Sequence, residues 1–87
     1  MSTNFDQLLT FPTLFVFRII AQNKDGIVEE CSASLLEIFS SIEGSKKIPS
    51  KSGKYLRIQL VVTALDGAQL YRGYDALKTV EGIRMVF

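Results

Sequence analysis

The chain has 87 residues, 47% of them hydrophobic and 22% charged, which is typical of one folded domain and excludes a disordered chain. Ten Lys and Arg residues against nine Asp and Glu residues give a net charge of +1, so charge alone indicates neither a nucleic acid nor a membrane as partner. With no His and one Cys, the sequence excludes His-based catalysis, a His-containing or multi-Cys metal site and an internal disulfide. We therefore expect no catalytic residue, no metal and no cofactor.

The beginning of the chain predicts a short arm followed by a strand. Residues 1–12 form this arm of a single domain that spans residues 1–87, and Phe5, Leu8 and Leu9 lie at helical spacing within it. Pro12 ends the helical turn, because the residue before a proline favours an extended backbone. Residues 14–21 are rich in Phe, Val and Ile and predict the first strand.

Residues 25–43 predict the first long helix. Asn23 or Asp25 is expected to cap its beginning, and Gly44 is expected to end it in a left-handed conformation. Its apolar residues recur every three or four positions and form one stripe: Ile27, Val28, Cys31, Leu35, Ile38, Phe39 and Ile42. Because Cys31 lies on this stripe and no His can activate it, we interpret it as a buried apolar residue.

A hairpin follows the helix. Residues 45–50 predict a weak strand at the edge of a sheet, because Pro49 lacks the N–H that an inner strand needs. After a turn at Ser52 and Gly53, residues 54–64 alternate regularly between apolar and more polar side chains. The predicted inner face carries Leu56, Ile58, Leu60 and Val62, and the outer face carries Tyr55, Arg57, Gln59, Val61 and Thr63.

The last third of the chain predicts a helix and a strand. Asp66 and Gln69 have the spacing of a capping box and open the helix, whose inner face is expected to carry Leu70, Gly73, Tyr74 and Leu77. Residues 82–87 predict the final strand. Its alternation is expected to place Ile83, Met85 and Phe87 on one side and Arg84 and Val86 on the other.

The resulting order, β-α-β-β-α-β, predicts an α+β fold of the ferredoxin-like type. Right-handed crossovers place both helices on one face of a four-stranded antiparallel sheet, with the first and third strands in its centre. The other face is left without a helix. We expect it to carry Leu14, Val16, Arg18 and Ile20, the outer residues of the third strand, and Arg84 and Val86.

Several short segments resemble the YbeD-like family (domain of unknown function 493), a group of small uncharacterised bacterial proteins. The resemblance extends from about residue 8 to residue 87, in the same order and at nearly the same spacing. It depends on Phe11-Pro12-Thr13, the first strand with Phe15, Phe17, Arg18 and Ile19, Pro49-Ser50, Gly53 and Tyr55, Tyr74 and Leu77, and Ile83-Arg84-Met85-Val86. The family's fold is similar to that of ACT domains, which are small regulatory modules, although a shared fold does not establish a function.

Charge is divided between an acidic helix and a basic hairpin. Residues 25–43 contain acidic residues and no Lys or Arg, whereas residues 44–57 contain no acid and hold Lys46, Lys47, Lys51, Lys54 and Arg57. The basic hairpin either attracts an anionic ligand or partner, or prevents an edge strand from pairing with other chains, which is a routine use of Lys at an edge.

Two functional hypotheses follow. In the first, the chain is a non-catalytic, ACT-like regulatory or interaction module that binds another protein or a second copy through the helix-free face, and a small anionic metabolite near the hairpin. The residues expected to bind are Val16, Arg18, Lys51, Ser52, Gly53, Lys54, Tyr55, Arg57 and Arg84. In the second, a single-stranded nucleic acid binds this face and the basic hairpin. It is disfavoured because stacking needs two or three outward aromatic rings, and only Tyr55 is expected to point outward.

The sequence also predicts a cytoplasmic location. The first ten residues contain no Lys or Arg, and the early apolar run ends at Arg18, far short of the length that spans a bilayer. A single Cys is typical of a reducing compartment. We therefore expect no membrane partner.

Overall fold

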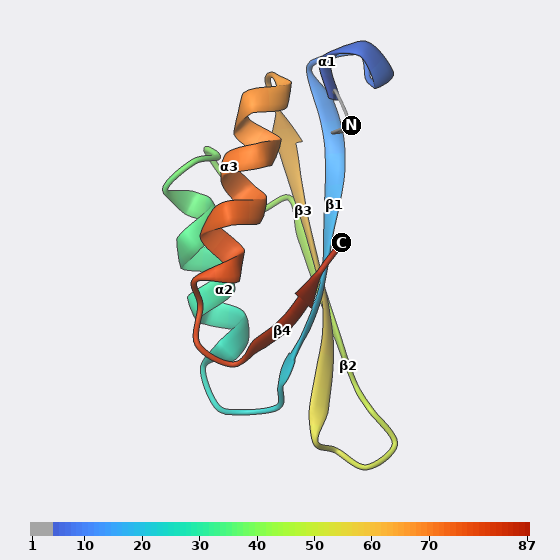
Figure 1. Ribbon diagram of the computed structural model, residues 1–87, viewed down its shortest axis with the longest axis vertical. Helices are drawn as coiled ribbons and strands as arrows, with labels where there is room; N and C mark the ends of the chain where they lie inside the picture. Colours follow the sequence, from blue (N-terminus) through green and yellow to red (C-terminus); the bar gives the residue numbers. More distant parts are fainter. Residues whose placement is uncertain (1–4) are drawn as a thin grey trace.

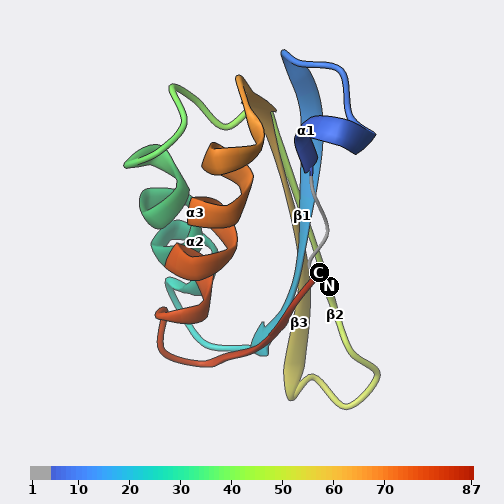
Figure 2. The same ribbon diagram turned by 45° about the horizontal axis from the view of Figure 1, so that its top comes forward.

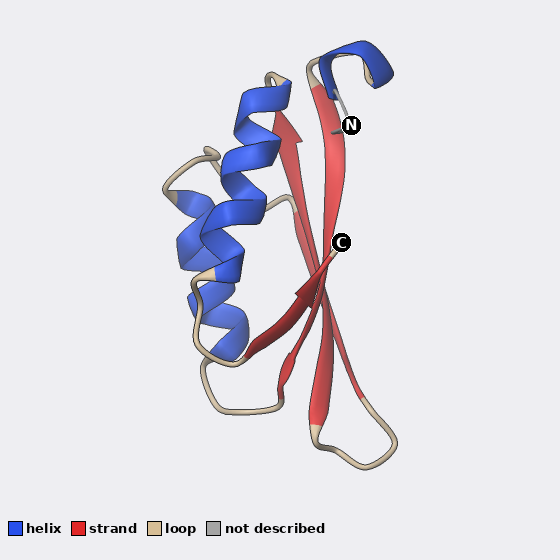
Figure 3. Ribbon diagram, viewed as in Figure 1, coloured by secondary structure: helices blue, strands red, loops and turns tan. Residues whose placement is uncertain are grey.

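The computed structural model describes residues 5–87, so residues 1–4 of the predicted arm lie outside the described residues. Figure 1 labels the helices and strands in chain order, and Figure 3 distinguishes helices from strands by colour. They are α1 (Phe5–Leu8), β1 (Thr13–Gln22), α2 (Ile27–Leu36), β2 (Gly44–Pro49), β3 (Tyr55–Ala64), α3 (Gly67–Lys78) and β4 (Ile83–Val86). From β1 onward this order confirms the predicted β-α-β-β-α-β pattern.

The strands form one antiparallel sheet in the order β2-β3-β1-β4, which confirms β1 and β3 as the central strands. The pairing of β1 with β3 is regular over its whole length, from Thr13 opposite Ala64 to Gln22 opposite Tyr55. Figures 1 and 2 show α2 and α3 on the same side of this sheet and no helix over most of its other side. The fold is therefore the predicted ferredoxin-like α+β arrangement.

The core lies between the sheet and the two long helices. Alternate residues of β1 and β3 point toward the helices because successive side chains of a strand face opposite ways. The buried apolar residues are Phe17, Ile19, Ala21, Ile27, Cys31, Leu35, Phe39, Leu56, Ile58, Leu60, Val62, Ala64, Leu70 and Leu77. Phe15 is partly buried and packs against this cluster, so both Phe15 and Phe17 point inward as predicted.

A glycine controls how closely α3 approaches the sheet. A Cβ atom on Gly73 would lie 2.6 Å from Cζ of Phe17 and 3.2 Å from Cε2 of Phe39, closer than packed carbon atoms lie. Phe17 is fully buried, so its ring has no open space into which it can move. Gly73 therefore lets the helix lie directly on the central aromatic ring of the core.

The predicted helix over residues 25–43 is too long. The observed α2 ends at Leu36, and Gly44 begins β2 instead of ending the helix. The chain leaves the helix in a tight turn, in which the N–H groups of Ile38 and Phe39 both donate to the Leu35 carbonyl. This turn places the buried Phe39 side chain near Phe17, with ring centroids 6.0 Å apart. The helical spacing of apolar residues therefore continues past the end of α2 although the helix does not.

A side chain of α3 stabilises this early end of α2. Gln69 Nε2 donates to the carbonyl of Ile38 at 3.1 Å, and Gln69 Oε1 accepts from the N–H of Leu65 at 2.7 Å. The predicted cap of α3 is confirmed, since Asp66 Oδ1 accepts from the N–H of Gln69 at 2.9 Å. Gln69 thus joins the beginning of one helix to the end of the other.

The predicted caps of α2 are wrong. Its N-cap is Gly26, at a φ of 82°, with no hydrogen bond from a capping side chain. This left-handed backbone favours glycine over either predicted residue. Asn23 instead bonds to the hairpin: its side-chain Nδ2 donates to the carbonyl of Gly53 at 3.0 Å.

The arm contacts the body through an aromatic cluster. The ring of Phe5 in α1 lies 5.8 Å from Phe15 and 4.9 Å from Tyr71, measured between centroids, and stacks parallel to Tyr74 at 6.2 Å. Offset and edge-on aromatic pairs at these distances are favourable. The predicted helical turn at residues 5–9 is therefore present, and its Phe5 ring contacts side chains of both β1 and α3.

The alternation predicted for the last strand is wrong after Arg84. Ile83 lies opposite Ala21, but Met85 lies opposite Ile20, so the register shifts and Arg84 is an extra residue in β4. Such a β-bulge reverses which face the following residues occupy. Val86, opposite the buried Ile19, consequently packs against the core, and Met85 and Phe87 are the outward residues.

The packing of Gly73 predicts the result of a one-methyl substitution. We expect Gly73→Ala to lower the stability by about 1–3 kcal/mol, because the new methyl group overpacks the core by more than alanine's helix propensity offsets. Gly44→Ala is the matched control, since its Cβ would meet Val61 no closer than 3.7 Å. Thermal unfolding of both variants measures the effect, and equal melting temperatures would contradict the close approach of α3.

The bulge predicts opposite responses at neighbouring positions. We expect Val86→Asp to destabilise the fold by about 2 kcal/mol or more, because it brings a carboxylate against the apolar core. Met85→Asp is expected to change the stability by about 0.5 kcal/mol or less, because Met85 is 54% exposed. Urea unfolding measures the stability of both variants. A larger loss of stability for Met85→Asp than for Val86→Asp would contradict the bulge and indicate uninterrupted alternation.

Candidate functional site

The side of the sheet opposite α2 and α3 is called the open face here. Its residues form rows across the strands, since directly paired residues of neighbouring strands point to the same side. One row contains Lys46, Gln59 and Arg18, and the two backbone hydrogen bonds between Arg18 and Phe87 add Phe87 to it. The next row contains Ile48, Arg57, Ile20 and Met85. Two of the predicted arginines, Arg18 and Arg57, therefore occupy adjacent rows on the central strands.

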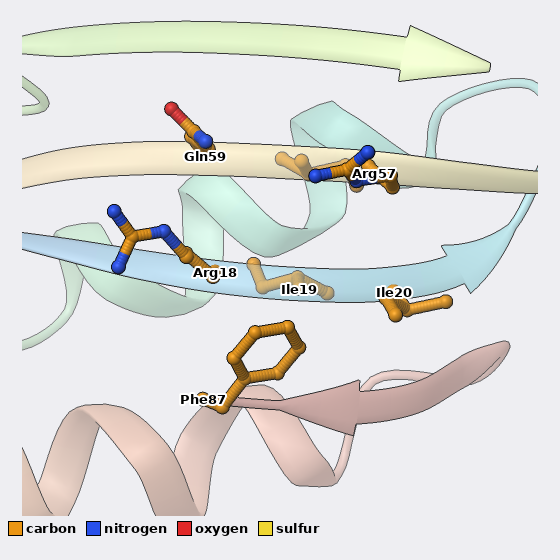
Figure 4. A pocket seen from close by; sticks show the side chains of 7 residues that line it. Arg18, Ile19, Ile20, Arg57, Gln59 and Phe87 are labelled. Carbon is orange, nitrogen blue, oxygen red and sulfur yellow. The ribbon is translucent and has the colours of Figure 1, made fainter. Parts of the chain in front are cut away.

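These two rows enclose a shallow depression of about 50 Å³. In Figure 4, the side chains of Arg18 and Gln59 lie at one end of it, Arg57 lies over β3 toward the other end, and the Phe87 ring closes the β4 side. The depression is too small for more than a few atoms of a ligand. Its chemistry is that of a contact surface, with guanidinium groups beside an aromatic ring and aliphatic side chains.

The cations of the open face have no acidic partner on the sheet. Within residues 5–87, the ion pair that the structure contains joins Lys24 to Glu81 at 3.5 Å, away from Arg18 and Arg57. Glu43 lies at the opposite end of this face, where its Oε2 accepts from Thr63 Oγ1 at 3.2 Å. The middle of the open face is therefore positively charged.

Exposed apolar side chains surround these cations. Leu14 is 66% exposed, Met85 54% and Phe87 53%, and Ile48 and Tyr55 are about two-fifths exposed. Val16, Ile20 and Val61 are half-buried between them. Val86, which was expected here, is on the other side, and Met85 and Phe87 were missed because the bulge has no signal in the hydrophobic pattern. Clustered exposed apolar groups are typical of a surface that another molecule covers.

The hairpin loop holds the remaining predicted residues beyond the end of the sheet. Lys51, Ser52, Gly53 and Lys54 are all exposed there. The loop is internally hydrogen-bonded: the N–H of Ser50 donates to the Tyr55 carbonyl at 2.9 Å, and the N–H of Tyr55 donates back to Ser50 Oγ at 3.2 Å. These hydrogen bonds join the two ends of the loop at Ser50 and Tyr55.

The predicted site with three arginines is divided into two places. Arg18 and Arg57 border the shallow depression, whereas Arg84 lines a separate hollow with Gln22, Lys54 and Tyr55. The bulge explains this separation, because it places Arg84 between the two rows that pair with Ile20 and Ala21.

Comparison with known proteins agrees with these sequence segments and with the fold. A family model described as a protein of unknown function (DUF493) matches residues 6–87, nearly the whole chain. The chain belongs to the DUF493 family. The UPF0250 proteins of Shewanella piezotolerans and Enterobacter sp. are 24% and 26% identical to it, and each alignment covers 98% or more of both chains. The resemblance to the YbeD-like family is thereby confirmed.

Solved structures with a similar fold include an ACT domain. The ACT domain from GTP pyrophosphokinase of Chlorobium tepidum has a TM-score of 0.67 and 19% identity, covering 85% of this chain and 94% of that one. A solution structure of a protein from H. pylori has a TM-score of 0.71 and 16% identity, covering 91% and 85%. At these identities the likeness concerns the fold alone.

No helix within residues 5–87 of this DUF493 protein is long and apolar enough to cross a membrane.

The single thiol of this DUF493 protein is in an unreactive environment. Cys31 is fully buried on the inner side of α2. Burial, followed by the negative charge of Glu30, raises the pKa of the Cys31 thiol to about 11. Because the thiolate is the nucleophilic form, its fraction at pH 7 is about one in ten thousand.

This environment predicts slow alkylation of Cys31. We expect the folded chain at pH 7.5 to react with iodoacetamide at least about a hundredfold more slowly than the chain unfolded in urea, because the thiol is both buried and protonated. Mass spectrometry of timed samples measures the rates. A rate in the folded chain equal to that of the unfolded chain would show an accessible thiolate and contradict the structure.

Proposed function

We propose that this DUF493 protein is a non-catalytic interaction module that binds an acidic partner protein through the open face. The observation that carries the proposal is the pair of exposed guanidinium groups, Arg18 and Arg57, on the central strands of a sheet with no covering layer of long helices. Exposed apolar groups around the two cations supply area to bury, and the cations supply specificity for carboxylates.

Protection of a sheet edge does not account for these arginines. Lys46 and Lys47 lie on β2, an edge strand, where positive charge hinders pairing with another chain. Arg18 and Arg57 lie on β1 and β3, whose neighbours already pair with them on both sides. Edge protection therefore does not explain Arg18 and Arg57, whereas binding of an acidic partner does.

The charge pattern favours a different protein over a second copy. A two-fold pairing of open faces centred on Arg18 and Arg57 would bring the cations of the two copies together. Juxtaposed like charges cost several kcal/mol at an interface. A partner whose surface carries Asp and Glu among apolar residues avoids this cost.

A regulatory role is part of the same proposal. The regulatory part draws on the likeness in fold to an ACT domain from GTP pyrophosphokinase, because ACT domains are small regulatory modules. The buried, protonated state of Cys31 supports the absence of thiol catalysis. A nucleic acid remains the less favoured partner, because β1 and β3 present one exposed aromatic ring, that of Tyr55, where RNA-binding sheets of this layout stack two or three bases.

A charge-reversal pair tests the proposal. We expect immobilised wild-type chain to retain an acidic protein from lysate of its native host, and Arg57→Glu to reduce the binding of that purified protein by at least about tenfold. Arg72→Glu, which changes the net charge equally on the exposed side of α3, is expected to have little effect. Raising the salt concentration should weaken the wild-type complex.

Two results would contradict the proposal. One is equal loss of binding in Arg57→Glu and Arg72→Glu, which would indicate general charge attraction. The other is sedimentation of the isolated wild-type chain as a dimer that Arg57→Glu disrupts, which would assign the open face to a second copy.

A further inference from the structure

The end of the open face nearest the hairpin contains a separate hollow of about 270 Å³. It is lined by Gln22, Lys54, Tyr55 and Arg84. Its volume is close to the lower end of the range of small-molecule sites, roughly 300–1,000 Å³. The depression between Arg18 and Arg57 is several times smaller, so this hollow is the larger of the two places that hold predicted binding residues.

Hydrogen bonds from outside the hairpin hold one wall of the hollow in place. The N–H of Asn23 donates to the Lys54 carbonyl at 3.0 Å, and Asn23 Nδ2 donates to the Gly53 carbonyl at 3.0 Å. Ser52 Oγ accepts from the N–H of Lys54 at 3.3 Å. The backbone that carries Lys54 and Tyr55 is thus bonded both within the loop and to the segment that follows β1. A wall held in this way loses little conformational entropy on binding.

The opposite wall depends on the bulge in β4. The extra residue of that strand is Arg84, whose side chain lines the hollow, and bulges commonly direct a side chain toward a site. The N–H of Gln22 donates to the carbonyl of Gly82 at 2.8 Å, which joins this wall to the end of β1. Gly82 has a φ of 95°, a left-handed backbone that favours glycine, and a Cβ there would lie 3.2 Å from Cε of Lys24.

The chemistry of the lining selects the charge of a ligand. Arg84 offers a planar pair of N–H donors, Lys54 an ammonium group, and Tyr55 and Gln22 neutral donors. None of the four lining residues is acidic, and Glu81, the nearby acid, is paired with Lys24. A ligand with an ammonium group would therefore find cations and no carboxylate beside it.

We propose that this hollow binds a small organic dianion, a dicarboxylate or a phosphate monoester, and that it rejects zwitterionic amino acids. With a dicarboxylate, Arg84 pairs with one carboxylate through two N–H donors and Lys54 pairs with the other. With a phosphate monoester, both cations pair with oxygens of the same phosphate. The hydroxyl of Tyr55 and the amide of Gln22 complete the donor set. The proposal does not depend on the protein partner of the open face, because none of these four residues borders the depression between Arg18 and Arg57.

A titration followed by amide chemical shifts tests the ligand class. Succinate and aspartate form a matched pair, since aspartate is succinate with an added ammonium group, and glycerol 3-phosphate represents the phosphate monoesters. We expect saturable shifts at residues 22, 53–55 and 82–84 with succinate or glycerol 3-phosphate at millimolar concentration, and at least tenfold weaker binding of aspartate. No shift with either dianion, or equal binding of aspartate, would overturn the proposal.

Variants locate the site. Arg84→Ala is expected to weaken dianion binding at least about tenfold, the effect of removing a charge-assisted hydrogen bond, and Arg84→Lys is expected to restore part of it. Lys47→Ala is the control, because Lys47 lies in the same hairpin, on the edge strand β2, and does not line the hollow. Circular dichroism confirms that each variant is folded. Equal weakening by Lys47→Ala and Arg84→Ala would indicate unspecific attraction to the hairpin and overturn the proposal.

Discussion

The contact of Gly73 with Phe17 determines how the rest of this small fold is arranged. With no Cβ between them, α3 lies directly on the central ring of the core, and Phe39 reaches the same place from the turn after α2. Tyr74 extends this aromatic group to Phe15 and Phe5. Because α2 and α3 both lie on this side of the sheet, no long helix covers the apolar and cationic residues of the other side.

The two proposals divide this uncovered surface into regions of different chemistry. Its middle is broad and shallow, with guanidinium groups among exposed apolar side chains, which suits a protein surface. Its hairpin end is hollowed and lined by polar and cationic groups, which suits a small anion. The bulge in β4 separates the two regions, since it places Arg84 at the hollow and turns Met85 and Phe87 outward beside the arginines of the central strands.

Much of this arrangement was predictable from the sequence. The alternation in β3 is regular, and the inner residues of both central strands are buried or, for Phe15, partly buried, so the open face of these strands was predicted correctly. The cap formed by Asp66 and Gln69 was also predicted, because its signal lies within four residues.

The errors concern features that depend on contacts distant in the sequence. The end of α2 was misjudged because a turn at Ile38 and Phe39 mimics helical spacing, and its stabilising partner, Gln69, belongs to another element. The predicted cap of α2, Asn23 or Asp25, is wrong because the chain places Gly26 there and the Asn23 amide bonds to the hairpin. The bulge was missed because alternation over residues 82–87 fits either register, and only pairing with β1 reveals the extra residue. As a result, Met85, Phe87 and Gln22 were absent from the predicted site.

The most direct test of the uncovered sheet is the relaxation of methyl groups by a soluble paramagnetic probe in the isolated chain. The structure predicts strong relaxation at Met85, Leu14 and Ile20 and almost none at Leu60, Val62 and Leu70, which are fully buried. Protection of Met85 and Ile20 in the isolated chain, equal to that of Leu60, would show that the chain or a second copy already covers this surface. That result would contradict an open face available to another protein.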